Sequence, residues 1–176
     1  MIKNYLVTIL FIFLICSSCQ KDEDTPIIND QISLVGTWKL TDLSVRNGII
    51  SSTILDENFL INYTSEGKDF DYTLKISDDP NSIEGNGSYT SVMTTTALGK
   101  KEIYEERVSD FLGSGSWKII KHHLIITSQG QTTVGDILEF TDDHIIIKQK
   151  FEYKVEDSVM GTEAITSGIL TYRLER

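Results

Sequence analysis

The sequence predicts an all-β domain built from about ten antiparallel strands. Apolar and polar residues alternate through most of the chain after Leu34, as they do in half-buried strands. No segment has the periodicity of an amphipathic helix, and the only prolines, Pro26 and Pro80, lie outside the alternating runs. Consecutive antiparallel strands must either stack as two sheets or close on themselves, and closure removes exposed edges.

Two runs alternate most regularly. Phe70–Ile76 is the first, and the turn residues Asp78–Asn81 end it; His144–Val155 is the second. In the strand that opens at Gly36, the apolar residues change phase between Leu40 and Leu43, which predicts a bulge. Shorter strands are expected at 59–64, 87–96, 103–108, 124–128, 137–140 and 169–174.

The first residues have the pattern of a cleaved bacterial lipoprotein signal. Lys3 precedes an apolar run, Tyr5–Ile15, that is shorter than the roughly 18–20 residues needed to cross a bilayer. Ser17 and Ser18 supply the small side chains that a signal peptidase needs before Cys19, whereas cleavage before Cys16 would place bulky Ile15 at the cut. We therefore expect residues 1–18 to be removed and Cys19 to be lipidated.

Residues 19–33 are polar and acidic, which predicts a flexible tether after the lipidated cysteine. Its first part, Gln20–Asp24, resembles the export signal on surface lipoproteins of one large Gram-negative phylum. The resemblance implies several acyl chains on Cys19, palmitate among them, and attachment to the outer membrane with display on the cell surface. Anchoring at the periplasmic face, with this run as a solvated linker, is the alternative.

Composition narrows the classes of partner and chemistry. The formal charge is −10, and loss of Lys3 with the signal makes the mature chain more negative still, which disfavours nucleic acid and anionic membrane surfaces. After processing, Cys19 is the only cysteine and acylation uses its thiol. We therefore expect no disulfide, thiolate metal site or cysteine nucleophile in residues 34–176, which we interpret as one domain.

A repeated motif indicates how the strands are arranged. Gly36-Thr37-Trp38 recurs as Gly115-Ser116-Trp117, each time with a glycine two residues before a tryptophan at the start of a strand. Glycine allows close backbone approach, and the indole then plugs one end of a closed sheet. In this motif the chain resembles the lipocalin-like, calycin-type domains of bacterial lipoproteins.

The resemblance covers residues 34–176 and implies an antiparallel up-and-down β-barrel of about 8–10 strands. The second motif would open a hairpin from Trp117 to Ser128 that turns at His122-His123. The family also stacks a basic residue of the last strand over the first tryptophan. Arg173 is the matching candidate, although Tyr172 and Leu174 are expected inside, which puts Arg173 on the other face.

A small, mostly apolar ligand is the expected partner of the barrel interior. Large aromatic rings can line a pocket for such a ligand or can fill a narrow barrel completely, and both interpretations stay open. The predicted interior aromatic residues are Phe59, Phe70, Tyr72, Phe140, Phe151 and Tyr153. The predicted ligand-binding set adds Trp38, Trp117 and Gln149 to them.

Catalytic and metal sites are not expected. His122 and His123 would point to opposite sides of an extended strand, and here they are expected at a solvated turn rather than in a metal site. Glu105 and Glu106 should likewise face opposite sides of a strand, so they could not act on one bond. We therefore expect no enzyme, cofactor or metal. The alternative function is a non-catalytic accessory module with a filled barrel that docks a surface protein or glycan.

Overall fold

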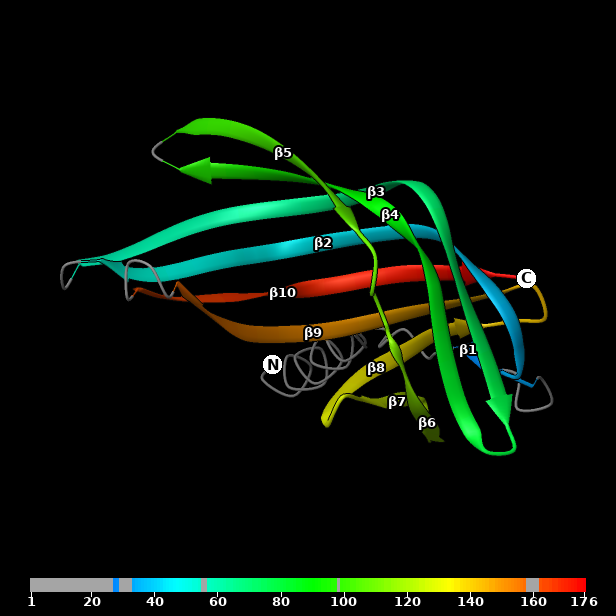
Figure 1. Ribbon diagram of the computed structural model, residues 1–176. Helices are drawn as coiled ribbons and strands as arrows, with labels where there is room; N and C mark the ends of the chain where they lie inside the picture. Colours follow the sequence, from blue (N-terminus) through cyan, green and yellow to red (C-terminus); the bar gives the residue numbers. More distant parts are fainter. Residues whose placement is uncertain (1–26, 29–32, 55–56, 98, 158–161) are drawn as a thin grey trace, which may run out of the picture.

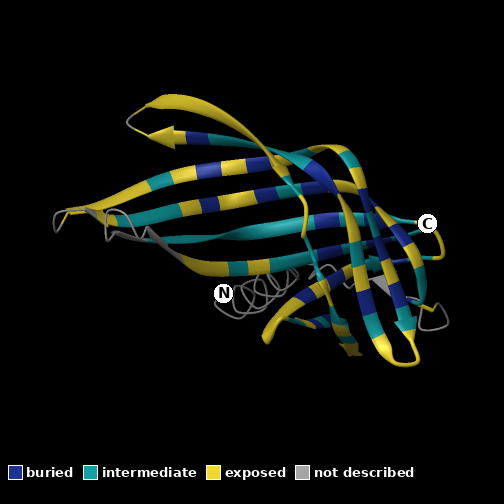
Figure 2. Cartoon of the chain, viewed as in Figure 1, coloured by how far each residue is buried: buried dark blue, intermediate teal, exposed yellow. Residues whose placement is uncertain are grey.

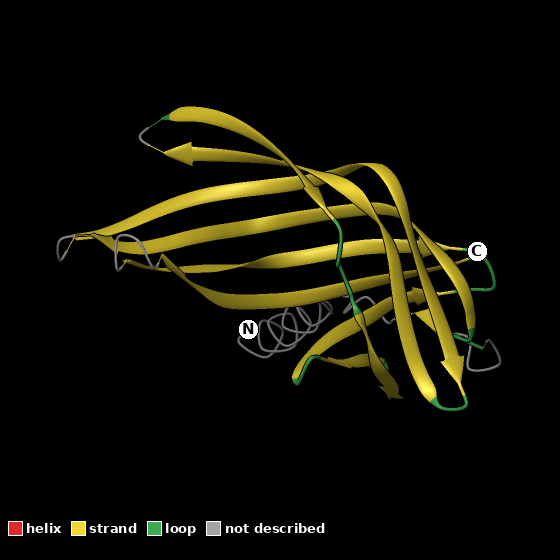
Figure 3. Cartoon of the chain, viewed as in Figure 1, coloured by secondary structure: helices red, strands yellow, loops and turns green. Residues whose placement is uncertain are grey.

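In the described part of the chain, the computed structural model is built from strands joined by short loops, without helices (Figure 3). The described residues are 27–28, 33–54, 57–97, 99–157 and 162–176. Their ten strands are β1 (Ile27–Ile28), β2 (Gly36–Ile54), β3 (Glu57–Asp78), β4 (Asn81–Ala97), β5 (Lys100–Val108), β6 (Ser114–Ile120), β7 (His123–Ser128), β8 (Gln131–Phe140), β9 (His144–Asp157) and β10 (Thr162–Glu175). The predicted all-β class is confirmed.

The strands form one sheet that closes in a ring (Figure 1). Its order is β1-β8-β7-β6-β4-β3-β2-β10-β9, and pairing between β8 and β9 closes it. All ring pairings are antiparallel, whereas β1 joins β8 in parallel at Glu139 and Phe140. Ile27 and Ile28 are thus paired residues within the segment that the sequence indicates as a tether.

The ring closes over only part of its length. β8 pairs with β9 between Asp136 and Phe140, and β6 pairs with β4 at Ser82–Glu84 alone. Beyond these pairings, β2, β3, β9 and β10 continue well past the short strands β6–β8 (Figure 1). There β4 pairs with β5 instead, and in the described residues β5 has no other strand neighbour. The sheet is therefore closed at one end and split between β5 and β9 at the other.

The hydrophobic core lies at the closed end, where buried residues concentrate (Figure 2). Trp38, Leu74, Ile145 and Ile147 have no exposed surface. The Trp38 indole donates a hydrogen bond to the Leu34 carbonyl at 2.8 Å, and its ring centroid lies 6.2 Å from that of Phe140. The plug expected of the first Gly-x-Trp motif is thus present at this end.

The cation over Trp38 is Arg176, not Arg173. The Arg176 guanidinium carbon lies 4.2 Å from the centroid of the indole ring. Arg173 faces the other way and donates to Glu175 at 2.7 Å, because the buried side chains of Tyr172 and Leu174 occupy the inner face of β10. The sequence periodicity placed Arg173 outside correctly, and the cation over Trp38 comes from Arg176, just beyond β10.

The predicted phase change in the first strand is confirmed as a bulge. The register between β2 and β3 shifts between Lys39 and Ser44, and that between β10 and β2 shifts next to Leu174. Trp38 and Leu43 can therefore both be buried although they lie in opposite phases of the alternation. The runs predicted at 59–64 and 70–76 are one strand, β3. A register shift near Asp69 changes the inward-facing residues from odd-numbered ones, such as Tyr63, to even-numbered ones, such as Tyr72.

The second Gly-x-Trp copy opens the predicted β6–β7 hairpin, but the turn lies at Lys121 and His122, one residue before the predicted His122-His123, because His123 already pairs with Ile120 as the first residue of β7. Gly115 must be a glycine because a Cβ there would lie 2.1 Å from the Thr127 carbonyl oxygen. The Trp117 indole donates to the Ser77 carbonyl at 2.8 Å, but its side chain is only partly buried. The two copies are therefore similar locally and differ in burial.

Candidate functional site

A groove of about 530 Å³ runs along the concave face of the sheet at its split end. Its floor comes from β2, β3 and β10, and its walls come from β4 and β5 on one side and β9 on the other. Its volume lies within the range of roughly 300–1,000 Å³ typical of small-molecule sites. The lining residues are Leu43, Val45, Ile50, Tyr63, Ser65, Tyr89, Ser91, Met93, Glu106, Val108, Asp110, Phe111, Gln149, Phe151, Tyr153, Thr166 and Leu170.

Aromatic rings dominate the walls of the groove, and small residues make room for them. Phe151 and Tyr153 stack on one face of β9, with ring centroids 5.3 Å apart. Across the sheet, Gly168 lies opposite Phe151, and a Cβ on Gly168 would come within 3.1 Å of that ring. Gly48 similarly leaves space for Tyr63, whose ring atoms would be 2.6 Å from an added Cβ. The two glycines thus allow rings to lie flat against the strands.

Polar groups occupy defined positions among these rings. The Ser65 and Ser91 hydroxyls hydrogen-bond to each other at 2.8 Å between β3 and β4. Burial, and to a lesser extent the nearby Tyr153, raises the pKa of Tyr63 to about 12. Burial also raises the pKa of Tyr89 to about 12, with Tyr153, Glu106 and Tyr72 adding to the effect. These phenols stay protonated to higher pH than exposed tyrosines do, and as phenols they can donate and accept hydrogen bonds.

These raised pKa values predict an alkaline loss of stability. Below about pH 10 the phenols are protonated in both the folded and unfolded states, so their contribution is constant. Between about pH 10 and 12 the unfolded chain loses these protons first, and the free energy of unfolding should fall as the pH rises. We expect the tyrosinate absorbance of the folded protein to rise at higher pH than that of the protein in urea. Coincident titration curves would contradict the burial of these phenols.

The loop 109–113 separates the groove from a second, more polar cavity of about 730 Å³. Phe111 of this loop packs edge-on against Tyr72, Tyr89 and Tyr172, with ring centroids 5.2–5.8 Å apart. The Leu112 amide donates to the Tyr72 hydroxyl, and the Gly85 amide donates to the Gly113 carbonyl at 3.0 Å. Asp110, Phe111, Gln149 and Leu170 line both cavities, so the anchored loop forms the partition between two adjoining hollows.

The predicted ligand-binding residues fall into separate environments. Gln149, Phe151 and Tyr153 line the groove. Trp38, Tyr72 and Phe140 are buried in the core of the closed end, and Phe70 packs against that core with its ring stacked on Tyr89. Trp117 is also partly buried against the core.

One interior placement is wrong. Phe59 is 49% exposed, because it lies near the far end of β3, beyond the part of the ring that closes. Tyr153 is similarly exposed, at 54%, but its ring still contributes to the groove wall. Strand alternation reports which face a side chain occupies, and it does not report how far along the strand the ring remains closed.

Several groove residues were not identified from the sequence. Tyr63 and Tyr89 lie within predicted strand runs, and extending the two-residue alternation from Phe59 would have placed Tyr63 on the same face. Phe111 and Asp110 lie in a loop, where no periodic signal exists. Glu106 does face away from Glu105, as predicted: Glu106 lines the groove, whereas Glu105 accepts from Lys68 at 2.9 Å.

Among the described residues, one cluster of side chains that could ligate a metal lies outside the groove. His122, His123 and Asp136 offer donor atoms within 4.8 Å of one another. The two histidine rings lie close together, with centroids 4.0 Å apart, because the chain turns here instead of continuing as an extended strand. His123 Nδ1 is already 2.7 Å from the Asp136 carboxylate, and buried Leu124 and Ile137 take the inner positions beside them. The group is an outward-facing cross-strand contact between β7 and β8.

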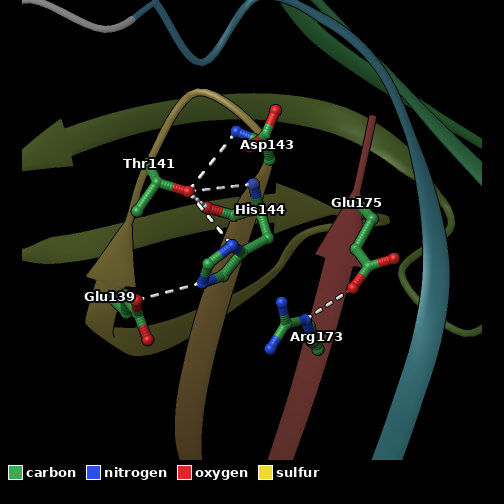
Figure 4. Close-up of polar contacts among 6 residues, drawn as sticks. All are labelled: Glu139, Thr141, Asp143, His144, Arg173 and Glu175. Carbon is green, nitrogen blue, oxygen red and sulfur yellow. Dashed lines mark hydrogen bonds and ion pairs between the residues drawn. The ribbon is translucent and has the colours of Figure 1, made fainter.

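A second polar cluster surrounds the β8–β9 turn (Figure 4). The Thr141 hydroxyl oxygen accepts from the His144 amide at 3.1 Å and from the Asp143 amide at 3.4 Å, and it lies 3.1 Å from His144 Nδ1. His144 Nε2 is 3.1 Å from the Glu139 carboxylate. A hydroxyl, an imidazole and a carboxylate thus lie next to one another, as they do in some catalytic sites. Here the Thr141 hydroxyl is held by main-chain amides, so the cluster stabilises the turn that closes the ring.

No family model matches the chain, and no curated protein matches it significantly. Within the described residues, no helix has the length and apolar character required to cross a membrane.

Proposed function

We propose that this chain is a membrane-anchored lipoprotein with a lipocalin-like barrel that binds a small, mostly apolar ligand. The groove at the split end carries the proposal, because it combines a volume of about 530 Å³ with aromatic walls and a few polar groups. A completely filled interior would favour a different task. In this chain the packed core occupies the closed end, and the hollow begins where β5 replaces β6 beside β4.

The ligand proposal is tested by native mass spectrometry of the protein isolated from its host. We expect an additional mass that denaturation removes. Phe151→Ala should lose this mass, because Phe151 forms part of the groove wall. Phe59→Ala is the matched control: it also removes a phenyl ring, but from an exposed position outside the groove, and should keep the ligand. A bare mass for the unaltered protein, with no ligand recovered from its host, would contradict the proposal.

We infer the membrane anchor from Ser17-Ser18-Cys19 and the preceding apolar run. The proposed location is the outer membrane, with the acidic run after Cys19 favouring the cell surface over the periplasmic face. Cys19→Ser should move the protein from the membrane fraction to the soluble fraction, because it removes the acyl acceptor. Continued partition into membranes would contradict lipidation at Cys19. Protease treatment of intact cells distinguishes surface display from periplasmic anchoring.

A second function, docking of a surface protein or glycan, is favoured by one observation. Leu60 and Ile103 are 68% and 67% exposed on the outer face of the split end. β5 also has one unpaired edge in the described residues, although its many charged side chains discourage indiscriminate strand pairing. If docking is the function, Leu60→Ser should abolish partner capture while Phe151→Ala leaves it intact.

A further inference from the structure

The described lining of the groove is acidic on one side and includes no basic side chain that would neutralise a bound anion. Glu106 lies on the inner face of β5, opposite Ser91 of β4, and Asp110 follows β5 directly. None of the described residues that line the groove is lysine, arginine or histidine. The adjoining cavity shares Asp110, and the described residues that line it likewise include no basic side chain.

Both carboxylates act on the inner tyrosines. Glu106 is among the groups that raise the pKa of Tyr89, after burial and Tyr153. Burial is likewise the main cause of the raised pKa of Tyr72, and Asp110 adds to it. Their negative charges therefore reach into the hollow rather than acting only on bulk solvent. Glu106 and Asp110 are themselves exposed, so a bound carboxylate or phosphate would meet like charge from two solvated carboxylates, and salt should screen this repulsion.

The aromatic walls complement a cation as well as an apolar body. Phe111, Phe151, Tyr89 and Tyr153 border the same hollow, and the face of an aromatic ring attracts an ammonium group within about 6 Å of its centroid. Leu43, Val45 and Leu170 provide apolar floor beside them. Rings, aliphatic floor and two carboxylates thus match a ligand that carries an apolar body and one positive charge.

We propose that the groove selects organic amines with an apolar body and rejects fatty acids and other organic anions, with Glu106 and Asp110 as the residues that determine this specificity. This inference rests on the proposed ligand-binding function and adds the charge class of the ligand.

The experiment compares three probes with one apolar body, namely decylamine, decanol and decanoate, by isothermal titration calorimetry on the delipidated protein near neutral pH. We expect decylamine to bind at least tenfold more tightly than decanol, and decanoate to bind most weakly. Glu106→Gln and Asp110→Asn should each reduce the affinity for decylamine several-fold and leave that for decanol unchanged. Because the attraction is electrostatic, added salt should weaken amine binding alone.

Glu105→Gln is the matched control. It removes the same charge from the adjacent residue of β5, but on the outer face, where Glu105 contacts Lys68. It should leave the amine preference intact. If all three variants keep the preference, or if all three lose it equally, the assignment to the groove carboxylates is overturned.

Failure of the inference is distinguishable from failure of the proposed function. If decanol and decanoate bind as tightly as decylamine, and Phe151→Ala weakens all three, the groove binds apolar ligands without charge selection. That result overturns this inference alone. If no probe binds and the native protein carries no extra mass, both are overturned.

Discussion

Trp38→Ala should lower the free energy of unfolding by about 3–5 kcal/mol, the usual range for removing a fully buried large aromatic side chain. Trp38 has no exposed surface and packs against Phe140 at the closed end of the ring. Its loss would also deprive Arg176 of the ring it stacks on and the Leu34 carbonyl of its indole donor. Urea unfolding followed by far-ultraviolet circular dichroism measures the change without relying on tryptophan fluorescence.

The second motif provides the matched control. Trp117→Ala removes the same side chain from the equivalent position of the second Gly-x-Trp copy, but from a partly buried site on the edge of the core. We expect a smaller loss of about 1–2 kcal/mol, from partial burial and one hydrogen bond to the Ser77 carbonyl. Equal losses in the two variants would contradict the view that only the first tryptophan seals the closed end.

Gly87→Ala should be the most disruptive single-methyl addition in β4, with an expected loss of about 4 kcal/mol or more. Gly87 has φ +103°, a backbone conformation that residues other than glycine rarely adopt. An added Cβ would also lie 1.7 Å from the Asp71 carbonyl oxygen, where the register between β3 and β4 has just shifted. A backbone carbonyl cannot rotate away as a side chain can, so β3 and β4 would have to separate locally.

Gly130→Ala separates conformational strain from this clash. Gly130 has φ +80°, but nothing lies within 4 Å of the position its Cβ would take. Its substitution should cost only the backbone strain of about 1–2 kcal/mol. Chemical denaturation of both variants tests the difference. If Gly87→Ala were no less stable than Gly130→Ala, the close approach of β3 and β4 at Asp71 would be wrong.

The local features of this chain were largely predictable from its residues. Alternation in 70–76 and 144–151 identified strands and the face of each that packs inward, since a side chain on a strand has only two sides to occupy. The opposite orientations of Glu105 and Glu106 followed from the same rule. Features that depend on distant residues did not follow: the cation over Trp38 came from Arg176, and Phe59 lay beyond the closed part of the ring.

The sequence by itself determined the all-β class, the positions of most strands and the bulge near Leu40. It also determined that a second Gly-x-Trp copy opens a hairpin later in the chain. These features arise from short-range alternation and steric preference. Only the tertiary structure decided that the ring closes at one end and splits at the other, because strand lengths and pairing partners are set by contacts between distant segments. Around the groove at this split lie Tyr63, Tyr89, Glu106 and the loop residue Phe111. They come from three strands and a loop, and their positions in the sequence do not indicate that they meet.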